Sequence, residues 1–254
     1  MRNLNALQHP HQTPQPARFV VTIADHQEEV RACQRLRYDI FTGEMQAQLN
    51  TPLEGHDIDH FDDFCDHLYV RDIETNSIIA TTRMLTNQAA AKAGSYYSET
   101  EFDIKNIISA PSRYMEIGRT CVHPRYRRGV GLQYLWQGVA TVMTMRRIQY
   151  LFGCVSIPHL QDGAYISGIM RHIRKNHYAP GYLRVTPRTP VAMQTVDDSV
   201  PVVMPPLLRT YLNMGALACG EPCLDEAFRV ADIFILVDRQ KMNKSYDRHF
   251  LRGQ

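Results

Sequence analysis

The sequence has no apolar run approaching the roughly 18 residues that a membrane-spanning helix needs. Its N-terminal stretch has no apolar core of the kind found in secretion signals, so we expect a cytoplasmic protein. There is also no large excess of one charge: 28 Lys and Arg oppose 26 Asp and Glu, a formal net charge of +2. A general nucleic-acid binder normally carries a larger excess of positive charge, so no nucleic-acid partner is expected.

Paired cysteine motifs are absent as well. The 6 cysteines are scattered and none forms a Cys-x-x-Cys pair, which predicts free thiols and argues against a zinc or redox centre. What is present is enough apolar material for a core, since 44% of the 254 residues are hydrophobic. No repeat or linker divides the chain. We expect a disordered tail over 1–17, rich in Pro, Gln and His, and a single domain over 18–254 with a C-terminal extension.

The charges that cancel overall are separated along the chain. Eight acidic residues between Glu54 and Glu74 oppose Arg71 alone, and eleven basic residues between Arg119 and Arg188 oppose a single Asp. Such segments are often solvated faces. The alternative is a cationic substrate near the acidic segment and an acidic partner on the basic one.

The order of elements predicts a mixed α/β fold. An N-cap at Asp25, with Glu28 three residues later, predicts the start of the first helix. Pro158 is expected at the first position of a later helix that runs to residue 176. Strands are expected over 18–24, 67–73, 77–85, 114–123, 150–157 and 232–237, and further helices over 129–148 and 207–214.

A basic, glycine-containing turn lies between the strand over 114–123 and the strong helix that follows. The segment 127–131 has the sequence Arg-Arg-Gly-Val-Gly. The first N–H groups of a helix are unpaired, and its dipole favours negative charge there, so this turn predicts an anion site. An ordinary strand-to-helix turn with surface arginines is the alternative.

Glu116 and Arg119 lie in the apolar strand just before that turn. Burial of either charge is costly unless it is paired or used. A spacing of three residues places them on opposite faces of a regular strand. A bulge over 118–121 would bring both to one site; a purely structural ion pair is the alternative.

Two further segments carry charged residues at suggestive spacings. Arg37 and Phe41 end the first helix, and Asp59 and Asp62 follow in an acidic loop. The histidines of this loop allow a metal site, but the segment has no element that would fix their geometry. We therefore favour carboxylates that hold an ammonium group, and no metal.

Together these residues resemble the acyl-acyl-carrier-protein-dependent branch of the GNAT superfamily. That branch includes the acyl-homoserine-lactone synthases and the ornithine N-acyltransferases of ornithine-lipid synthesis. The synthase motifs are matched by Arg37, Phe41, Asp59, Phe61, Asp62, Arg83, Glu116 and Arg119. The later segments 205–216 and 228–236 resemble the ornithine acyltransferases more closely.

The resemblance implies an α/β (α+β) fold with a GNAT-like mixed, mostly antiparallel sheet flanked by helices. It implies N-acyl transfer of a (3-hydroxy)fatty acyl group from acyl carrier protein to the α-amine of ornithine, with a phosphopantetheine-linked acyl thioester as substrate and no bound cofactor. The expected catalytic residues are Glu116 and Arg119. The expected donor-binding residues are Val122, Arg128, Gly129 and Gly131, and the expected acceptor-binding residues are Arg37, Phe41, Asp59, Asp62 and Arg83.

The expected partners follow from the same resemblance. Acidic acyl carrier protein is expected to dock on Arg125, Arg127, Arg146 and Arg147. The acyl chain is expected in an apolar tunnel lined by Trp136, Phe152, Met143 and Met170. The amphiphilic product suggests peripheral contact with the inner face of the membrane. A synthase of another N-acyl amino acid or signal molecule, and a non-catalytic GNAT-like lipid-binding module, remain alternatives.

Overall fold

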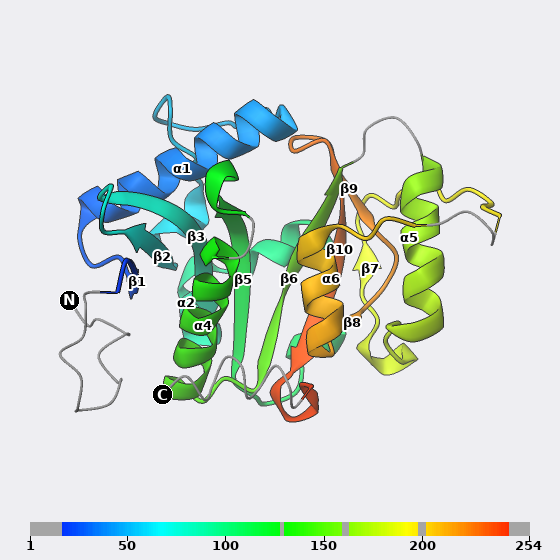
Figure 1. Ribbon diagram of the computed structural model, residues 1–254. Coiled ribbons are helices and arrows are strands. Elements are labelled where there is room, and N and C mark those ends of the chain that lie inside the picture. Colours follow the sequence, from blue (N-terminus) through cyan, green and yellow to red (C-terminus); the bar gives the residue numbers. More distant parts are fainter. Residues whose placement is uncertain (1–16, 128–129, 159–162, 198–201, 244–254) are drawn as a thin grey trace.

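The computed structural model describes residues 17–127, 130–158, 163–197 and 202–243, and these are organised around one sheet of eight strands (Figure 1). The strands follow the order β1-β2-β3-β5-β6-β10-β8, and β9 also pairs with β10. Their bounds are β1 Phe19–Ile23, β2 Asp66–Asp72, β3 Ser77–Thr86, β5 Tyr114–Val122, β6 Tyr150–Pro158, β8 Leu217–Ala218, β9 Cys223–Asp225 and β10 Val230–Asp238. A separate two-stranded sheet pairs β4 (Phe102–Asp103) with β7 (Thr186–Pro187).

Helices cover both faces of the main sheet. Figure 1 shows α4 and α6 over the near face. The helices are α1 Gln27–Met45, α2 Asn87–Ala93, α3 Lys105–Ile108, α4 Val130–Met145, α5 Gly163–Asn176 and α6 Pro206–Met214. Among the described residues, no helix combines the length and the apolar character needed to cross a membrane. The expected mixed, mostly antiparallel sheet flanked by helices is confirmed.

Two large apolar cores hold these layers together, and a smaller one lies under α1. One lies between the sheet and α4, α5 and α6, and includes Leu135, Ile169 and Leu208. The other lies on the opposite face and is rich in aromatic side chains, among them Phe102 and Phe152. The alternation of apolar residues in central strands places side chains in both cores, because successive residues point to opposite faces.

One pair of neighbouring strands departs from the antiparallel pattern. β5 and β6 are parallel and are connected through α4. They pair only from Tyr114 to Glu116 on β5 and from Tyr150 to Phe152 on β6. Beyond Glu116 and Phe152 the two strands are no longer paired, which opens the sheet at its centre.

Two predicted helix starts were wrong. The first helix begins at Gln27, so its N-cap is His26 rather than Asp25, and the N-cap side chain makes no capping hydrogen bond. The carboxylate of Glu29, rather than that of Glu28, reaches back and accepts a hydrogen bond from the backbone N–H of Asp25 at 3.2 Å. Pro158 is the last residue of β6, opposite Val230 of β10, and α5 begins at Gly163. Proline is tolerated at the end of a strand, because the backbone N–H that proline lacks is least needed for pairing there. The expected tail over 1–17 lies outside the described residues except for Ala17.

Candidate active site

A cavity of about 270 Å³ lies where β5 and β6 diverge. Residues of both strands line it, together with side chains from α1, α6 and β10. Between Thr81 and Arg83 the register of β3 against β5 shifts, so that an additional residue of β5 is accommodated, and Arg119 has a φ of 52°. This is the bulge expected over 118–121, and Glu116 and Arg119 both line the cavity.

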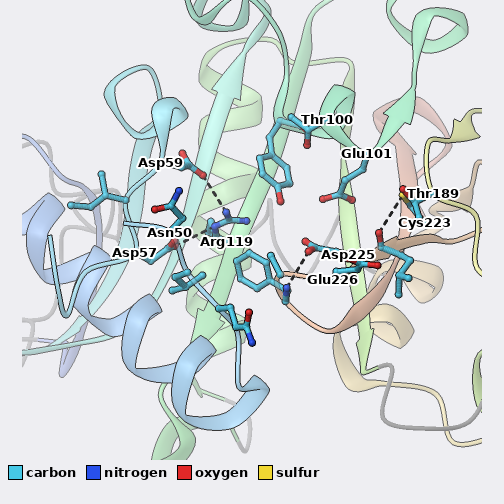
Figure 2. Close-up of a pocket in the computed structure, with 17 residues that line it drawn as sticks. Asn50, Asp57, Asp59, Thr100, Glu101, Arg119, Thr189, Cys223, Asp225 and Glu226 are labelled. Atoms are coloured by element: carbon cyan, nitrogen blue, oxygen red, sulfur yellow. Dashed lines mark hydrogen bonds and ion pairs between the residues drawn. The ribbon is translucent and has the colours of Figure 1, made fainter. Parts of the chain in front are cut away.

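A second, more open cavity of about 550 Å³ adjoins the first. The two share Tyr97, Glu101, Arg119, Asp225 and Phe228 as lining residues. Figure 2 shows Arg119 with Asp57 and Asp59 on one side of this second cavity, and Glu101 with Asp225 on the other. The site therefore has one wall that carries a guanidinium with its paired carboxylates, and another wall that carries carboxylates.

Glu116 is buried and its carboxylate is engaged by the turn that follows residue 96. Its oxygens accept hydrogen bonds from the backbone N–H groups of Tyr97 at 2.8 Å and Ser98 at 2.7 Å, and from the Ser98 hydroxyl at 2.5 Å. Burial raises the pKa of Glu116, although these donors oppose the rise. A carboxylate has about four acceptor positions, so roughly one remains open toward the cavity.

Arg119 is fixed from several directions. Its guanidinium lies 3.2 Å from carboxylate oxygens of both Asp57 and Asp59. The Tyr97 ring lies 4.8 Å and the Phe228 ring 4.5 Å from its central carbon, which is cation–π distance. These contacts hold the guanidinium at the junction of the two cavities.

The predicted acceptor residues form a buried ion-pair network beneath Arg119. Arg37, which has no exposed side-chain surface, contacts Asp57 at 2.7 Å and Asp62 at 2.9 Å. Arg83 contacts Asp59 at 2.5 Å and Asp62 at 3.3 Å. Arg37, Asp62 and Arg83 line neither cavity, whereas Asp59 lines the larger one.

The negative charge of the buried carboxylates in this network is stabilised by the arginines that they contact. Burial alone would raise the pKa of Asp62, but the guanidinium groups of Arg37 and Arg83 outweigh burial and lower that pKa to about 2.

Phe41, the remaining predicted acceptor residue, lies outside this network. It lines the smaller cavity and packs edge-to-face on Phe228, with 5.4 Å between the ring centres.

The predicted donor loop is only partly described. Arg128 and Gly129 lie outside the described residues. Gly131 packs against β5 so closely that a Cβ there would lie 2.6 Å from the Val122 side chain, which explains the glycine. Val122 lines neither cavity, and its carbonyl accepts a hydrogen bond from Arg127 Nε at 2.9 Å.

The four arginines expected to dock a carrier protein do not form one surface. Arg125 and Arg127 precede α4 and are exposed, and Arg127 pairs with Glu44 at 2.7 Å. Arg146 and Arg147 follow α4, whose 16 residues span about 24 Å. Sequence proximity to one helix placed both pairs together, but the length of that helix separates them.

The predicted tunnel residues are part of the cores. Trp136, Phe152, Met143 and Met170 are all buried in the apolar clusters, and none lines either cavity. The apolar lining of the smaller cavity comes instead from other side chains: Phe41, Met45, Ile117, Pro158, Leu207, Tyr211 and Phe228. Helical spacing alone did not separate core from cavity lining.

The histidines of the acidic loop point to separate partners. His56 lies beside Arg35, His60 contacts the carbonyl of Ala93, and His67 contacts the carbonyl of Asp62. In the described part of the chain, the only grouping of potential metal-ligating side chains is a different one: Glu101, Asp225 and Asp232.

The sequence did not predict that these three carboxylates line the site. Asp232 interrupts the apolar strand Val230–Asp238, and a buried aspartate there was a usable signal. Glu101 gave no signal, because its neighbours Glu99 and Asp103 make the segment resemble a solvated loop.

Comparison with known proteins places this geometry in a family. A family model described as an acetyltransferase (GNAT) domain matches residues 36–137. Two solved structures share the fold: an N-acyl amino acid synthase, FeeM, from uncultured soil microbes (TM-score 0.51, 12% identity, 88% of this chain and 92% of that one) and a CoA-dependent acyl-homoserine lactone synthase, BjaI (TM-score 0.50, 17% identity, 88% and 83%).

Curated relatives are more similar in sequence. The L-ornithine N(alpha)-acyltransferase of Brucella abortus is 32% identical over 246 residues, covering 91% of this chain and 88% of the relative. The protein of the same name from Rhodobacter capsulatus is 30% identical over 252 residues, covering 93% and 96%. The chain described here is a member of the L-ornithine N(alpha)-acyltransferase family, built on a GNAT fold.

Proposed function

We propose that this protein transfers a (3-hydroxy)fatty acyl group from the phosphopantetheine thioester of acyl carrier protein to the α-amine of ornithine, giving lyso-ornithine lipid. One observation carries the proposal: the sheet opens between β5 and β6 beside Glu116 and Arg119, onto a cavity with acidic walls. The names of the curated relatives support ornithine as acceptor.

The donor arm enters the gap between β5 and β6. Pairing between these strands stops at Glu116 and Phe152, so N–H groups on the facing edge of β5 beyond that point have no β6 partner. Unpaired backbone donors suit the amides of pantetheine and the oxyanion that develops on the thioester carbonyl. Arg128, Gly129 and Gly131 receive the phosphate, and Val122 flanks the arm.

The acceptor lies in the larger cavity. Arg119 binds its carboxylate, since a guanidinium presents several donors in a fixed plane. Asp57 and Asp59 hold Arg119 in position, and Arg37 and Asp62 lie behind them.

The reaction needs a neutral amine. Glu116, directly or through a water, takes a proton from the α-ammonium, and burial raises its pKa toward that task. The nitrogen then attacks the thioester carbon, an N–C bond forms and the C–S bond breaks, and the nitrogen gives up its second proton. One of the two protons leaves with pantetheine as the thiol, and the other passes to solvent. Burial raises the pKa of the Cys154 thiol well above its usual range, so we propose direct transfer without an acyl-enzyme.

Acyl carrier protein docks at the start of α4. Arg125 and Arg127 are exposed there, shortly after the end of β5. The acidic surface of the carrier complements them.

Peripheral contact of the protein with an anionic bilayer is a further proposal, and co-sedimentation with anionic vesicles tests it.

The function is tested with purified protein, ornithine and 3-hydroxyacyl carrier protein. Mass spectrometry should detect N-acylornithine with release of one thiol per product. Glu116→Gln should lower kcat by about 100-fold or more, the usual contribution of general base catalysis. Acylation of lysine or glycine in place of ornithine would favour another N-acyl amino acid synthase. Absence of any acylated amine would favour a non-catalytic binding protein.

A further inference from the structure

Three carboxylates converge where the two cavities meet. Glu101 lies between the turn at residues 97–100 and β4, Asp225 ends β9, and Asp232 lies within β10. One oxygen from each lies within 4.8 Å of the others. Glu101 and Asp225 line both cavities, and Asp232 lines the smaller one.

Glu101 is buried and poorly satisfied. The residue is 7% exposed, and neither of its carboxylate oxygens accepts a hydrogen bond of ordinary geometry from the described residues, although the Cys154 thiol and the Tyr97 hydroxyl lie nearby. Its neighbours are better satisfied: Asp232 accepts a hydrogen bond from the Ser156 hydroxyl at 2.7 Å, and Asp225 accepts one from the Phe228 N–H at 3.0 Å. An unpaired buried carboxylate is costly, so this position suits a ligand that brings its own donors.

The protein provides this cluster with little positive charge. Burial, and then the neighbouring carboxylates, raise the pKa of Glu101 well above its usual range, and the pKa of Asp232 rises to about 7. The guanidinium of Arg119 lies at the same junction but already contacts Asp57 and Asp59. A cation from outside would restore full ionisation of the cluster.

We infer that Glu101, Asp225 and Asp232 bind the side-chain ammonium of the acceptor and so make this protein selective for diamino acids. The inference rests on the proposed function, in which Arg119 binds the acceptor carboxylate. An ammonium has three N–H donors, one for each carboxylate. Hydrogen bonds of about 2.8 Å in tetrahedral directions place their acceptors about 4.6 Å apart, which is within the 4.8 Å limit on the separation of these oxygens.

The same cluster decides which amine reacts. Carboxylates favour the protonated form of an amine that they hold, and a protonated amine cannot attack a thioester. The side-chain nitrogen bound here therefore stays charged and unreactive, while the α-amine is left for Glu116. The cluster thus directs acylation to the α-nitrogen.

The test compares ornithine with norvaline, which has the same carbon skeleton without the second amine. We expect the wild-type protein to favour ornithine by about 100-fold or more in kcat/KM, because norvaline leaves buried polar groups unpaired. Glu101→Gln should remove most of this preference by lowering kcat/KM for ornithine and leaving the value for norvaline within about threefold. Fragmentation spectra of the ornithine product should then also show acylation of the side-chain nitrogen.

Two variants make the comparison specific. Asp232→Asn should act in the same direction as Glu101→Gln. Asp103→Asn is the matched control, since Asp103 is exposed only two residues from Glu101 and should leave both kcat/KM values unchanged. Thermal unfolding checks folding, and replacement of a poorly satisfied buried carboxyl group by an amide should not lower the melting temperature.

Three results would overturn the inference. The first is equal use of norvaline and ornithine by the wild-type protein. The second is an equal loss for both acceptors in Glu101→Gln with a shifted pH profile, which would identify a proton acceptor. The third is loss of activity with a chelator and recovery with Mg²⁺. Calorimetric binding of ornithine without donor separates this inference from the proposed function: tight binding that depends on Glu101 supports the cluster even where no acyl transfer occurs.

Discussion

Arg37 provides the sharpest test of the ion-pair network beneath the site. Its guanidinium has no exposed surface and contacts carboxylates of both Asp57 and Asp62. Arg37→Met keeps most of the side-chain volume but leaves two buried carboxylates without this partner. Removal of one member of a buried ion pair costs about 3–5 kcal/mol.

The expected loss of unfolding free energy corresponds to a decrease in melting temperature. With 254 residues and an unfolding entropy of about 2.1 cal/mol/K per residue, the total is about 530 cal/mol/K. Arg37→Met should therefore lower the melting temperature by about 6–9 °C in thermal unfolding followed by circular dichroism. Because Asp57 also contacts Arg119, KM for ornithine should rise more than KM for the acyl donor.

An exposed ion pair supplies the control. Glu44 and Arg127 are 2.7 Å apart, with side chains 39% and 43% exposed. Glu44→Gln should change stability by less than about 1 kcal/mol, or about 2 °C. If Arg37→Met melted within 2 °C of the wild-type protein, Asp57 and Asp62 would not depend on Arg37 and the reasoning would fail.

Three more predictions follow from single positions. Gly153→Ala should lower stability by about 1–3 kcal/mol and raise KM for the donor, because a Cβ there would lie 2.2 Å from the Ile117 carbonyl oxygen at the start of the gap; the exposed helical Gly43→Ala should not be destabilising. Asp62, whose pKa is about 2 when folded against an ordinary 3.8, should contribute about 2 kcal/mol of stability above pH 4 that is lost as the pH falls through 2, and Asp62→Asn should abolish this acid dependence in denaturant titrations. Arg125→Glu should raise KM for acyl carrier protein at low salt without changing KM for a short acyl-pantetheine donor, and an equal rise for both would contradict docking at this position.

Local patterns predicted much of the framework. Alternation located the six long strands to within a few residues, and a short turn over 74–76 joins β2 and β3. Glu116 and Arg119 in one apolar strand required a bulge to share a site, and Arg119 has the positive φ of that bulge. These features depend on neighbours in the chain, which is why periodicity and spacing revealed them.

Other features depend on segments that meet only in the folded protein. Asp62 looked like a ligand for the acceptor, but Arg37 and Arg83 from two other elements surround it. Pro158 looked like a helix start, but β10 supplies Val230 as its strand partner. A residue's neighbours across a sheet are set by strand order, which spacing along the chain does not encode.

The sequence by itself determined the class of fold, the position of the bulge and the family to which the chain is similar, because each rests on short, regular patterns of residues. The tertiary structure alone decided that Glu101, Asp225 and Asp232 meet at the junction of two cavities. These residues come from parts of the chain more than 120 positions apart, and β10 brings them together. In the sequence these acids resemble surface residues. They form a buried, poorly satisfied cluster only because the folded chain packs around them, and the sequence pattern does not encode that packing.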